Sequence, residues 1–344
     1  DVFAEKISSY LNTMKCIYIV PDHFDDFSPV QRCLRNSINS HFIEASPIPK
    51  SIAAVFAETK KRKILPGTEI NVVDKYDDYW IYTKIIAVLD KELLEMNPLS
   101  DGVVFERYPA NIITKDGLET VFNGDEKFIP KLFLKKECEL LKDKLSINAY
   151  HFSNSTVQNI NIPDFSSELN KIEEKNYSNK NVITIEIKDN ICSGALILED
   201  LQNLTPAIPL WKDHLPPLYI KVDSDGVEKR VDLVNKNHGA IRPKRGISVP
   251  IAIPVKDFIL PRGKKYYEFP LVQGDNKNRK QSYFALLESD KFPLKEDTLC
   301  ELHLTYTYGN EYPYELKFKS VYAEAEVKSV TVQWKINSKR NWFK

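Results

Sequence analysis

Three aspartates close together in the chain have the types and spacing that could do chemistry. Asp74, Asp77 and Asp78 lie in the segment INVVDKYDDYW (70–80), where a short apolar run ends at Asp74. Carboxylate oxygens are the ligands that divalent cations such as Mg²⁺ prefer. The pair Asp77-Asp78 could therefore bind a divalent ion, but two adjacent carboxylates on an exposed turn are usually just solvated. We assign no metal ligand to the sequence.

The common catalytic signatures are absent. There is no G-x-S-x-G elbow, no C-x-x-C pair, no H-E-x-x-H and no phosphate-binding G-x-x-x-x-G-K-[ST] loop. The six histidines never fall at metal-ligand spacing. Two basic clusters, at 60–63 and 242–245, lack the interleaved aromatic residues of nucleic-acid sites. We predict no catalytic residue and no nucleic-acid partner, and we lean towards a protein that is not an enzyme.

Composition indicates an ordinary globular protein of about two domains. The chain has 344 residues, 42% of them hydrophobic and 28% charged, and 48 basic residues balance 48 acidic ones. A net charge of zero gives no general attraction to nucleic acid or to an anionic membrane. No apolar run approaches the roughly 18 residues that span a bilayer. The five scattered cysteines argue against a disulfide framework, so we expect a reducing compartment, the cytoplasm.

The first half of the chain alternates strands and helices. The pattern predicts strands at 17–20, 70–73 and 80–89 and helices at 28–40 and 51–61. A further helix is expected at 127–145, where Leu134, Cys138, Leu141 and Leu145 fall on one face. This alternation is typical of an α/β domain.

From about residue 215 the pattern changes to short strands with a period of two, which predicts an antiparallel β-sandwich. A hairpin is expected to turn at Gly309-Asn310. One face of this hairpin should consist of Leu302, Leu304, Tyr306, Tyr308, Tyr312, Tyr314, Leu316 and Phe318. The segment NLTPAIPLWKDHLPP, with four prolines, separates the two halves. We predict domains at 1–205 and 217–336, joined by a proline-rich linker at 206–216.

Short segments in the same order resemble the seventy-kilodalton heat-shock chaperones across about residues 14–320. Each segment is weakly specific, and it is their shared order that makes the resemblance. In the first half they are IYIVPDHFDD (17–26), PIPKSIAAVF (47–56), NVVDKYDDYW (71–80), KKECELLKDKLS (135–146) and DNICSGALIL (189–198). In the second half they are RPKRGISVPIAI (242–253), FPLVQGDN (269–276), YFALLESDKFP (283–293) and LHLTYTYGNEYPYELKF (302–318). The resemblance implies a partial actin-like (ribonuclease H-like) ATPase lobe followed by a substrate-binding β-sandwich.

The departures from that family concern its nucleotide site. The family has a diglycine turn where this chain has residues 75–78, Lys-Tyr-Asp-Asp, and a glutamate where this chain has Ile48. Side chains and carboxylates oppose the close approach of a phosphate to backbone N–H groups. The family's first phosphate loop and its adenosine segment have no counterpart here. We therefore expect ATP and Mg²⁺ to bind weakly or not at all, with Asp74 and Asp78 as the first candidates for water-mediated magnesium ligands.

The stretch ISVPIAIPV (247–255) is where we place any polypeptide contact. Pro250 and Pro254 remove hydrogen-bond donors from a single side, so the strand should lie at a sheet edge. Its aliphatic face is either pure core, with the prolines preventing aggregation, or one wall of a groove for extended apolar peptide, with the segment 257–263 contributing. That face comprises Ile247, Val249, Ile251, Ile253 and Val255, and the predicted peptide-binding residues are Val249, Ile251, Ile253 and Phe258.

Three functions remain open from the sequence. The first is a chaperone-like or scaffold protein with a non-functional nucleotide site and a β-sandwich that binds polypeptide. The second is an active ATPase chaperone whose missing phosphate loops lie outside this chain. The third is an interaction module of a bacterial multi-protein system that kept the fold but not the peptide groove. All three predict a polypeptide or protein partner and no membrane partner.

Overall fold

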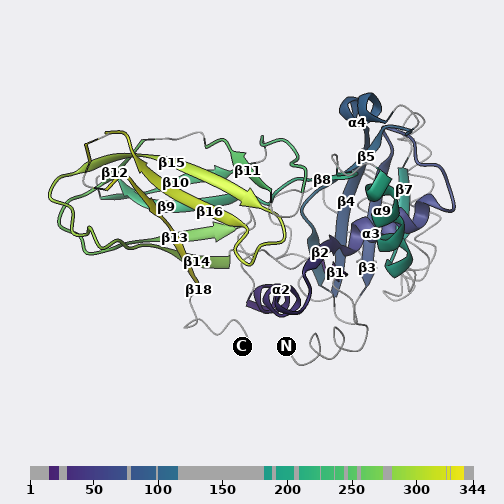
Figure 1. Cartoon of the computed structure of the whole chain (residues 1–344), viewed down its shortest axis with the longest axis horizontal. Helices are drawn as coiled ribbons and strands as arrows, with labels where there is room; N and C mark the ends of the chain where they lie inside the picture. Colours follow the sequence, from purple (N-terminus) through teal and green to yellow (C-terminus); the bar gives the residue numbers. More distant parts are fainter. Residues whose placement is uncertain are drawn as a thin grey trace, which may run out of the picture.

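A computed structural model gives the fold of most of the chain. The residues that it describes are 15–22, 29–75, 79–97, 100–114, 182–187, 191–204, 209–224, 226–235, 237–243, 247–253, 257–273, 281–322, 324–325 and 327–336. Figure 1 shows two parts: two layers of antiparallel strands at the left and a mixed sheet with helices at the right, with β8 between them.

A six-stranded mixed sheet organises the first part. Its strands follow the order β7-β3-β4-β5-β8, and β6 also pairs with β4. The consecutive strands β3, β4 and β5 are antiparallel, whereas β7 runs parallel to β3 and β8 runs parallel to β5. The strand bounds are β3 Glu69–Lys75, β4 Tyr79–Leu89, β5 Val103–Arg107, β6 Asn111–Thr114, β7 Val182–Glu186 and β8 Trp211–Asp213.

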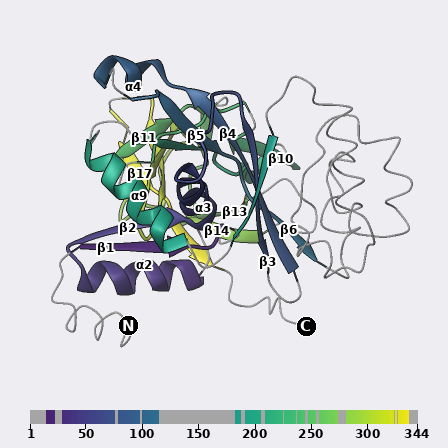
Figure 2. The same ribbon diagram turned by 90° about the vertical axis from the view of Figure 1, so that its right-hand side faces the viewer.

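Helix α3 (Lys50–Thr59) packs on one face of this sheet, against β3 and β7, and α9 (Ile191–Leu204) packs on α3. Figure 2 shows the two helices next to each other. The helices approach closely at Gly194, where a Cβ atom would overlap the Ala53 carbonyl group. Seven consecutive residues of α3, 51–57, are buried, so packing stabilises this helix.

A second, smaller sheet completes the first part. Strand β1 (Lys15–Val20) pairs in parallel with β2 (Glu44–Pro49), and α2 (Pro29–His41) connects them. Tyr18, Val20, Ile38, Phe42 and Ala45 form a buried cluster between α2 and these strands. A short helix, α4 (Lys91–Met96), starts where the Asp90 carboxylate accepts a hydrogen bond from the Leu93 N–H at 3.1 Å. Among the described helices, none combines the length and apolar character that a membrane span requires.

The second part is built from two antiparallel sheets that face each other. One has the order β10-β9-β13-β14-β18, and the other has the order β11-β15-β16-β17, with β12 also pairing with β15. Alternate residues of both sheets meet in one continuous core. The bounds are β9 Leu218–Ser224, β10 Val227–Val234, β11 Ser248–Ile251, β12 Asp257–Leu260, β13 Tyr267–Gln273, β14 Gln281–Leu287, β15 Thr298–Thr307, β16 Tyr314–Ser320, β17 Ser329–Thr331 and β18 Gln333–Ile336.

The mixed α/β, β-rich fold class is confirmed. The helices predicted at 28–40 and 51–61 appear as α2 and α3, and the predicted strands of the first half appear as β1, β3 and β4. The helix expected at 127–145, with Cys138, lies outside the described residues. The segment expected as a linker, 206–216, contains β8, which extends the mixed sheet at β5.

Two side chains do not lie where the sequence pattern placed them. Tyr312 was predicted on the core face of the β15–β16 hairpin, but it is 39% exposed because β15 ends at Thr307 and β16 begins at Tyr314. Ile247 was predicted on the core face of its strand, but it is 48% exposed because β11 begins only at Ser248. Both residues lie beyond the strand whose alternation was used to place them.

Candidate functional site

Lys50 binds the carboxylate of Asp74, which was a first candidate for a water-mediated magnesium ligand. Asp74 lies near the end of β3, which packs against α3, and its side chain is 6% exposed. Lys50, the first residue of α3, places Nζ 2.7 Å from each carboxylate oxygen of Asp74. This charge-assisted pair satisfies the carboxylate inside the protein. The Asp74 carboxylate is therefore paired with a lysine of the same chain. Asp78, the other candidate, lies outside the described residues.

A second carboxylate occupies the start of α3. The first N–H groups of a helix have no partner within it and form a natural anion site. Here Asp22, which follows β1, accepts a hydrogen bond from the Ser51 N–H at 2.8 Å and another from the Ser51 hydroxyl. Pro49, before the helix, supplies no cap of its own. An aspartate thus takes the place that an external anion would need.

Arg107 joins this carboxylate to the strand that leads into the sandwich. Its guanidinium lies 3.1 Å from Asp22 Oδ1 and 2.8 Å from Asp213 Oδ2. Arg107 ends β5 and Asp213 ends β8, so the pair bridges two neighbouring parallel strands. All three side chains are at most 15% exposed. The surrounding carboxylates raise the pKa of Arg107 although its burial opposes this, so the guanidinium stays charged.

The charges of this cluster do not cancel. Three carboxylates, those of Asp22, Asp74 and Asp213, meet two cations, Lys50 and Arg107. Burial raises the pKa of Asp22, the nearby charge of Asp74 adds to the effect, and Arg107 and Ser51 oppose it. An added phosphate would bring further negative charge beside three carboxylates that share these two cations.

Tyr308 connects the cluster to the sandwich. It follows β15, and its hydroxyl donates a 2.6 Å hydrogen bond to the carbonyl oxygen of Pro47 in β2. Its ring packs edge-on against Trp211 of β8, with the centroids 5.5 Å apart. Burial and the neighbouring Asp213 raise the pKa of Tyr308 well above its usual value, which keeps the hydroxyl protonated as a donor. Asp213 also exchanges two backbone hydrogen bonds with Ile241 of the second part, at 2.7 and 2.9 Å.

Helix α2 holds the turn of the β15–β16 hairpin on one side of this junction. Arg35 donates to the Asn310 carbonyl at 3.1 Å, and Arg32 pairs with Glu311 at 3.0 Å. The Arg32 guanidinium also lies 4.1 Å from the centroid of the Tyr312 ring. The exposed Tyr312, misplaced by the sequence pattern, is therefore a contact between the two parts.

Asp90 forms the other side of the junction. Its carboxylate lies 2.9 Å from Arg242 of the second part and 2.9 Å from Lys212 of β8, while Arg242 also pairs with Glu92 at 2.7 Å. Burial alone would raise the pKa of Asp90, but the hydrogen bonds from Lys212 and the Leu93 N–H, with the charge of Arg242, lower it. Polar contacts thus join the two parts at both α2 and α4.

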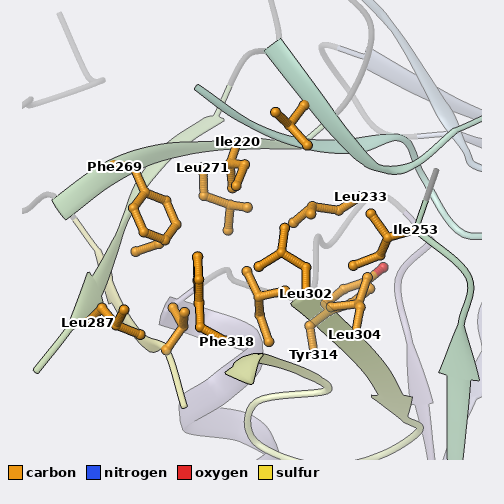
Figure 3. Packing of buried hydrophobic residues seen from close by; sticks show 14 of the residues in the cluster. Ile220, Leu233, Ile253, Phe269, Leu271, Leu287, Leu302, Leu304, Tyr314 and Phe318 are labelled. Carbon is orange, nitrogen blue, oxygen red and sulfur yellow. The ribbon is translucent and has the colours of Figure 1, made fainter. Parts of the chain in front are cut away.

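The predicted peptide-binding residues lie apart from this cluster, in the sandwich. Strand β11 lies at the edge of its sheet, as the two prolines predicted. Ile251 and Ile253 are 8% and 5% exposed and belong to the core, and Figure 3 shows Ile253 close to Leu304. Val249 and Phe258 keep part of their surface exposed. Burial of the two isoleucines favours the core interpretation of this strand, and Val255 lies outside the described residues.

Sequence reasoning missed Asp22, Lys50, Arg107 and Asp213. A usable signal existed for two of them: Asp22 comes two residues after a predicted strand, and Lys50 directly precedes a predicted helix. Nothing local marks Arg107 or Asp213. Among the described residues, no group of three or more histidine, cysteine, aspartate or glutamate side chains could hold a metal ion. The contacts of the cluster join α3 to β3 and to the segment after β1, and β5 to β8.

No family model matches the chain, and no curated protein matches it.

Proposed function

We propose that this chain is a chaperone-like protein that binds a polypeptide or protein partner without using ATP. The resemblance to the seventy-kilodalton heat-shock chaperones supplies the functional class. The Lys50–Asp74 pair is the observation that supports independence from nucleotide, because it places a satisfied carboxylate at the turn where the resembled family binds phosphate. Asp22 likewise accepts hydrogen bonds from Ser51 at the start of α3, where an anion would otherwise bind.

The strand order supports a partial actin-like lobe as the origin of the first part. Three consecutive antiparallel strands, β3, β4 and β5, are followed in the sheet by β7, which runs parallel to β3. Helix α3 packs on one face, α9 packs on α3, and β1 of the parallel pair β1–β2 contacts both helices. An antiparallel sandwich then follows β8. This succession of parts agrees with the succession that the resemblance implies.

The proposed function assigns the junction a structural role. Arg107 pairs with Asp213 of β8, and Tyr308 reaches from the sandwich to β2. These contacts need neither a nucleotide nor a metal. In this proposal they hold the sandwich against the first part permanently, so that binding of a partner does not depend on a nucleotide cycle.

A second candidate is an interaction module that kept the fold but not the peptide groove. The burial of Ile251 and Ile253 favours it, because side chains that are 8% and 5% exposed offer little surface to a ligand. This candidate also needs a protein partner, and it differs in the surface that the partner contacts.

We also propose a reducing compartment, the cytoplasm, as the location. Cys16, Cys33, Cys192 and Cys300 are free thiols, and burial raises the pKa of Cys300 to about 11, which keeps it protonated and unreactive. Cys138 lies outside the described residues.

A peptide-binding screen tests the proposal. The full chain is titrated into a panel of fluorescein-labelled extended apolar peptides, with and without ATP and Mg²⁺. We expect saturable binding to some peptides, with the same dissociation constant in the presence of nucleotide. Absence of binding across the panel would exclude the chaperone-like function and leave the interaction module. A large shift in affinity on addition of ATP would contradict independence from nucleotide.

A further inference from the structure

One edge of the sandwich consists of two short strands, of which one contains a proline that discourages pairing with another strand and the other does not. Strands β11 and β12 run in the same direction along one side of β15, β11 beside Leu304–Thr307 and β12 beside Thr298–Glu301. Within the described part of the chain, no strand pairs with the outer side of either. Proline on an edge strand removes a donor and discourages pairing with another chain. Pro250 does this in β11, whereas Asp257–Leu260 contains no proline.

The outward face of β12 carries an apolar row that ends at the accessible edge. Ile259 is 63% exposed and lies directly opposite Leu299 of β15. On the other side of Leu299, the Val321 N–H bonds to the Leu299 carbonyl at 3.0 Å, and Val321 is 47% exposed. Cross-strand neighbours on one face are close enough to pack together. An added strand would bring its own side chain next to Ile259 and continue this row.

The inward face of β12 is also incompletely covered at this edge. Phe258 points to the core, where its ring meets Phe318 edge-on at 5.9 Å, but part of it stays exposed. Successive side chains of a strand point to opposite faces. An incoming strand with two adjacent apolar residues would thus cover Ile259 with one and Phe258 with the other.

Charge favours one direction and composition of the incoming segment. Arg262, Lys264 and Lys265 follow β12 and are exposed. They outnumber the Asp297 carboxylate, which is bound to this segment and accepts a hydrogen bond from the Arg262 N–H at 2.8 Å. In an antiparallel pair, the first residues of the incoming strand lie beside the last residues of β12. Acidic residues that precede the apolar pair would therefore meet this basic segment, and antiparallel pairing is slightly the more stable arrangement.

The geometry points to β12 as a site of strand addition for an extended polypeptide in which acidic residues precede two adjacent apolar residues. Main-chain hydrogen bonds supply the affinity of such a mode, and alternate side chains supply its specificity. This inference depends on the proposed function, since it names the surface that the polypeptide contacts. It places that surface on Phe258 and Ile259, whereas the buried Ile251 and Ile253 remain in the core.

The probe is a fluorescein-labelled peptide, Glu-Glu-Gly-Val-Ile-Val-Ile-Gly-Ser, titrated into the full chain by fluorescence anisotropy. Ile259→Lys should weaken binding by about tenfold, because it removes one apolar contact of the size that a buried isoleucine provides. The matched control is Val227→Lys on the edge strand β10, which is 60% exposed and should leave the affinity unchanged. Both positions are exposed, so neither substitution should unfold the chain.

Hydrogen bonding between the peptide backbone and β12 can be tested separately from the side-chain contacts. Two further peptides carry N-methyl groups on one or the other set of alternate residues, and only the set that faces β12 should abolish binding. Hydrogen exchange should slow at Asp257–Leu260 when the unmodified peptide is bound.

The outcomes separate the site from the function. Equal affinities for wild type and Ile259→Lys, with no protection at β12, would overturn this site while leaving polypeptide binding in place. No binding of this peptide or of any peptide in the wider panel would overturn both. Concentration-dependent dimerisation that Ile259→Lys abolishes would assign the edge to a second copy of this chain and overturn the inference.

Discussion

Replacing Lys50 with methionine should destabilise the first part of the protein by leaving a buried carboxylate without its cation. Removing one partner of a buried ion pair costs about 3–5 kcal/mol. Lys50 keeps 20% of its side chain exposed and Asp74 keeps 6%. Because solvent screens the lysine in part, we expect a loss of about 3 kcal/mol, at the lower end of that range.

The assay is equilibrium unfolding in urea, followed by tryptophan fluorescence, for a set of four chains. The set is wild type, Lys50→Met, Asp74→Leu and the double variant. Replacing both members of a buried pair by apolar residues is often neutral, so the double variant should be about 2 kcal/mol more stable than Lys50→Met. A matched control is Lys63→Met, which breaks an exposed pair with Asp101 whose side chains are 65% and 63% exposed, and which should change the stability by less than about 1 kcal/mol.

Two results would refute this reasoning. A loss below about 1 kcal/mol for Lys50→Met would mean that solvent satisfies Asp74 and that the pair does not close the site. A double variant as unstable as the sum of the single variants would mean that Lys50 and Asp74 contribute independently.

Three other predictions concern the junction and the packing. Tyr308→Phe leaves its carbonyl partner in β2 unsatisfied and should cost about 1–3 kcal/mol in urea unfolding, and an unchanged midpoint would contradict the hydrogen bond. The pKa of Asp90 is lowered in the folded state, so the ionised carboxylate stabilises the fold at any pH above its unfolded pKa of about 3.9, and this stabilisation is lost as the pH falls through the folded pKa. Asp90→Asn should therefore flatten the pH dependence of the free energy of unfolding in that acidic range. An unaltered slope would contradict this role of Asp90. Gly194→Ala should destabilise by about 1–3 kcal/mol because its Cβ would overlap the Ala53 carbonyl, whereas Gly239→Ala, with open space around it, should change little; equal effects would contradict the close approach of α3 and α9.

Local patterns predicted the elements, because each pattern depends on neighbours in the sequence. The spacing of Ala53, Ala54 and Phe56 indicated α3, and the alternation from Leu302 to Tyr306 indicated β15. The prolines of ISVPIAIPV indicated an edge strand, since a missing donor is a property of the residue itself. Alternation failed at Tyr312 and Ile247, because it says nothing about where a strand ends.

The candidate site could not be predicted in the same way. Lys50 and Asp74 are 24 residues apart, and Asp22 and Arg107 are 85 residues apart. Such pairs form only after α3 has docked beside β3 and after β1 and β5 have been placed. A charged residue has no periodicity that marks its partner, so the sequence indicated the unsuitable turn after Asp74 but not the cation that satisfies it.

Calorimetric titration of ATP and Mg²⁺ into the full chain tests the central claim most directly. The Lys50–Asp74 pair and the Asp22–Ser51 contacts leave no unsatisfied donor for a phosphate among the groups that they engage. We therefore predict no saturable heat of binding at millimolar nucleotide, for wild type and for Lys50→Met alike. A saturable one-to-one isotherm with a micromolar dissociation constant would contradict the account and favour an active ATPase.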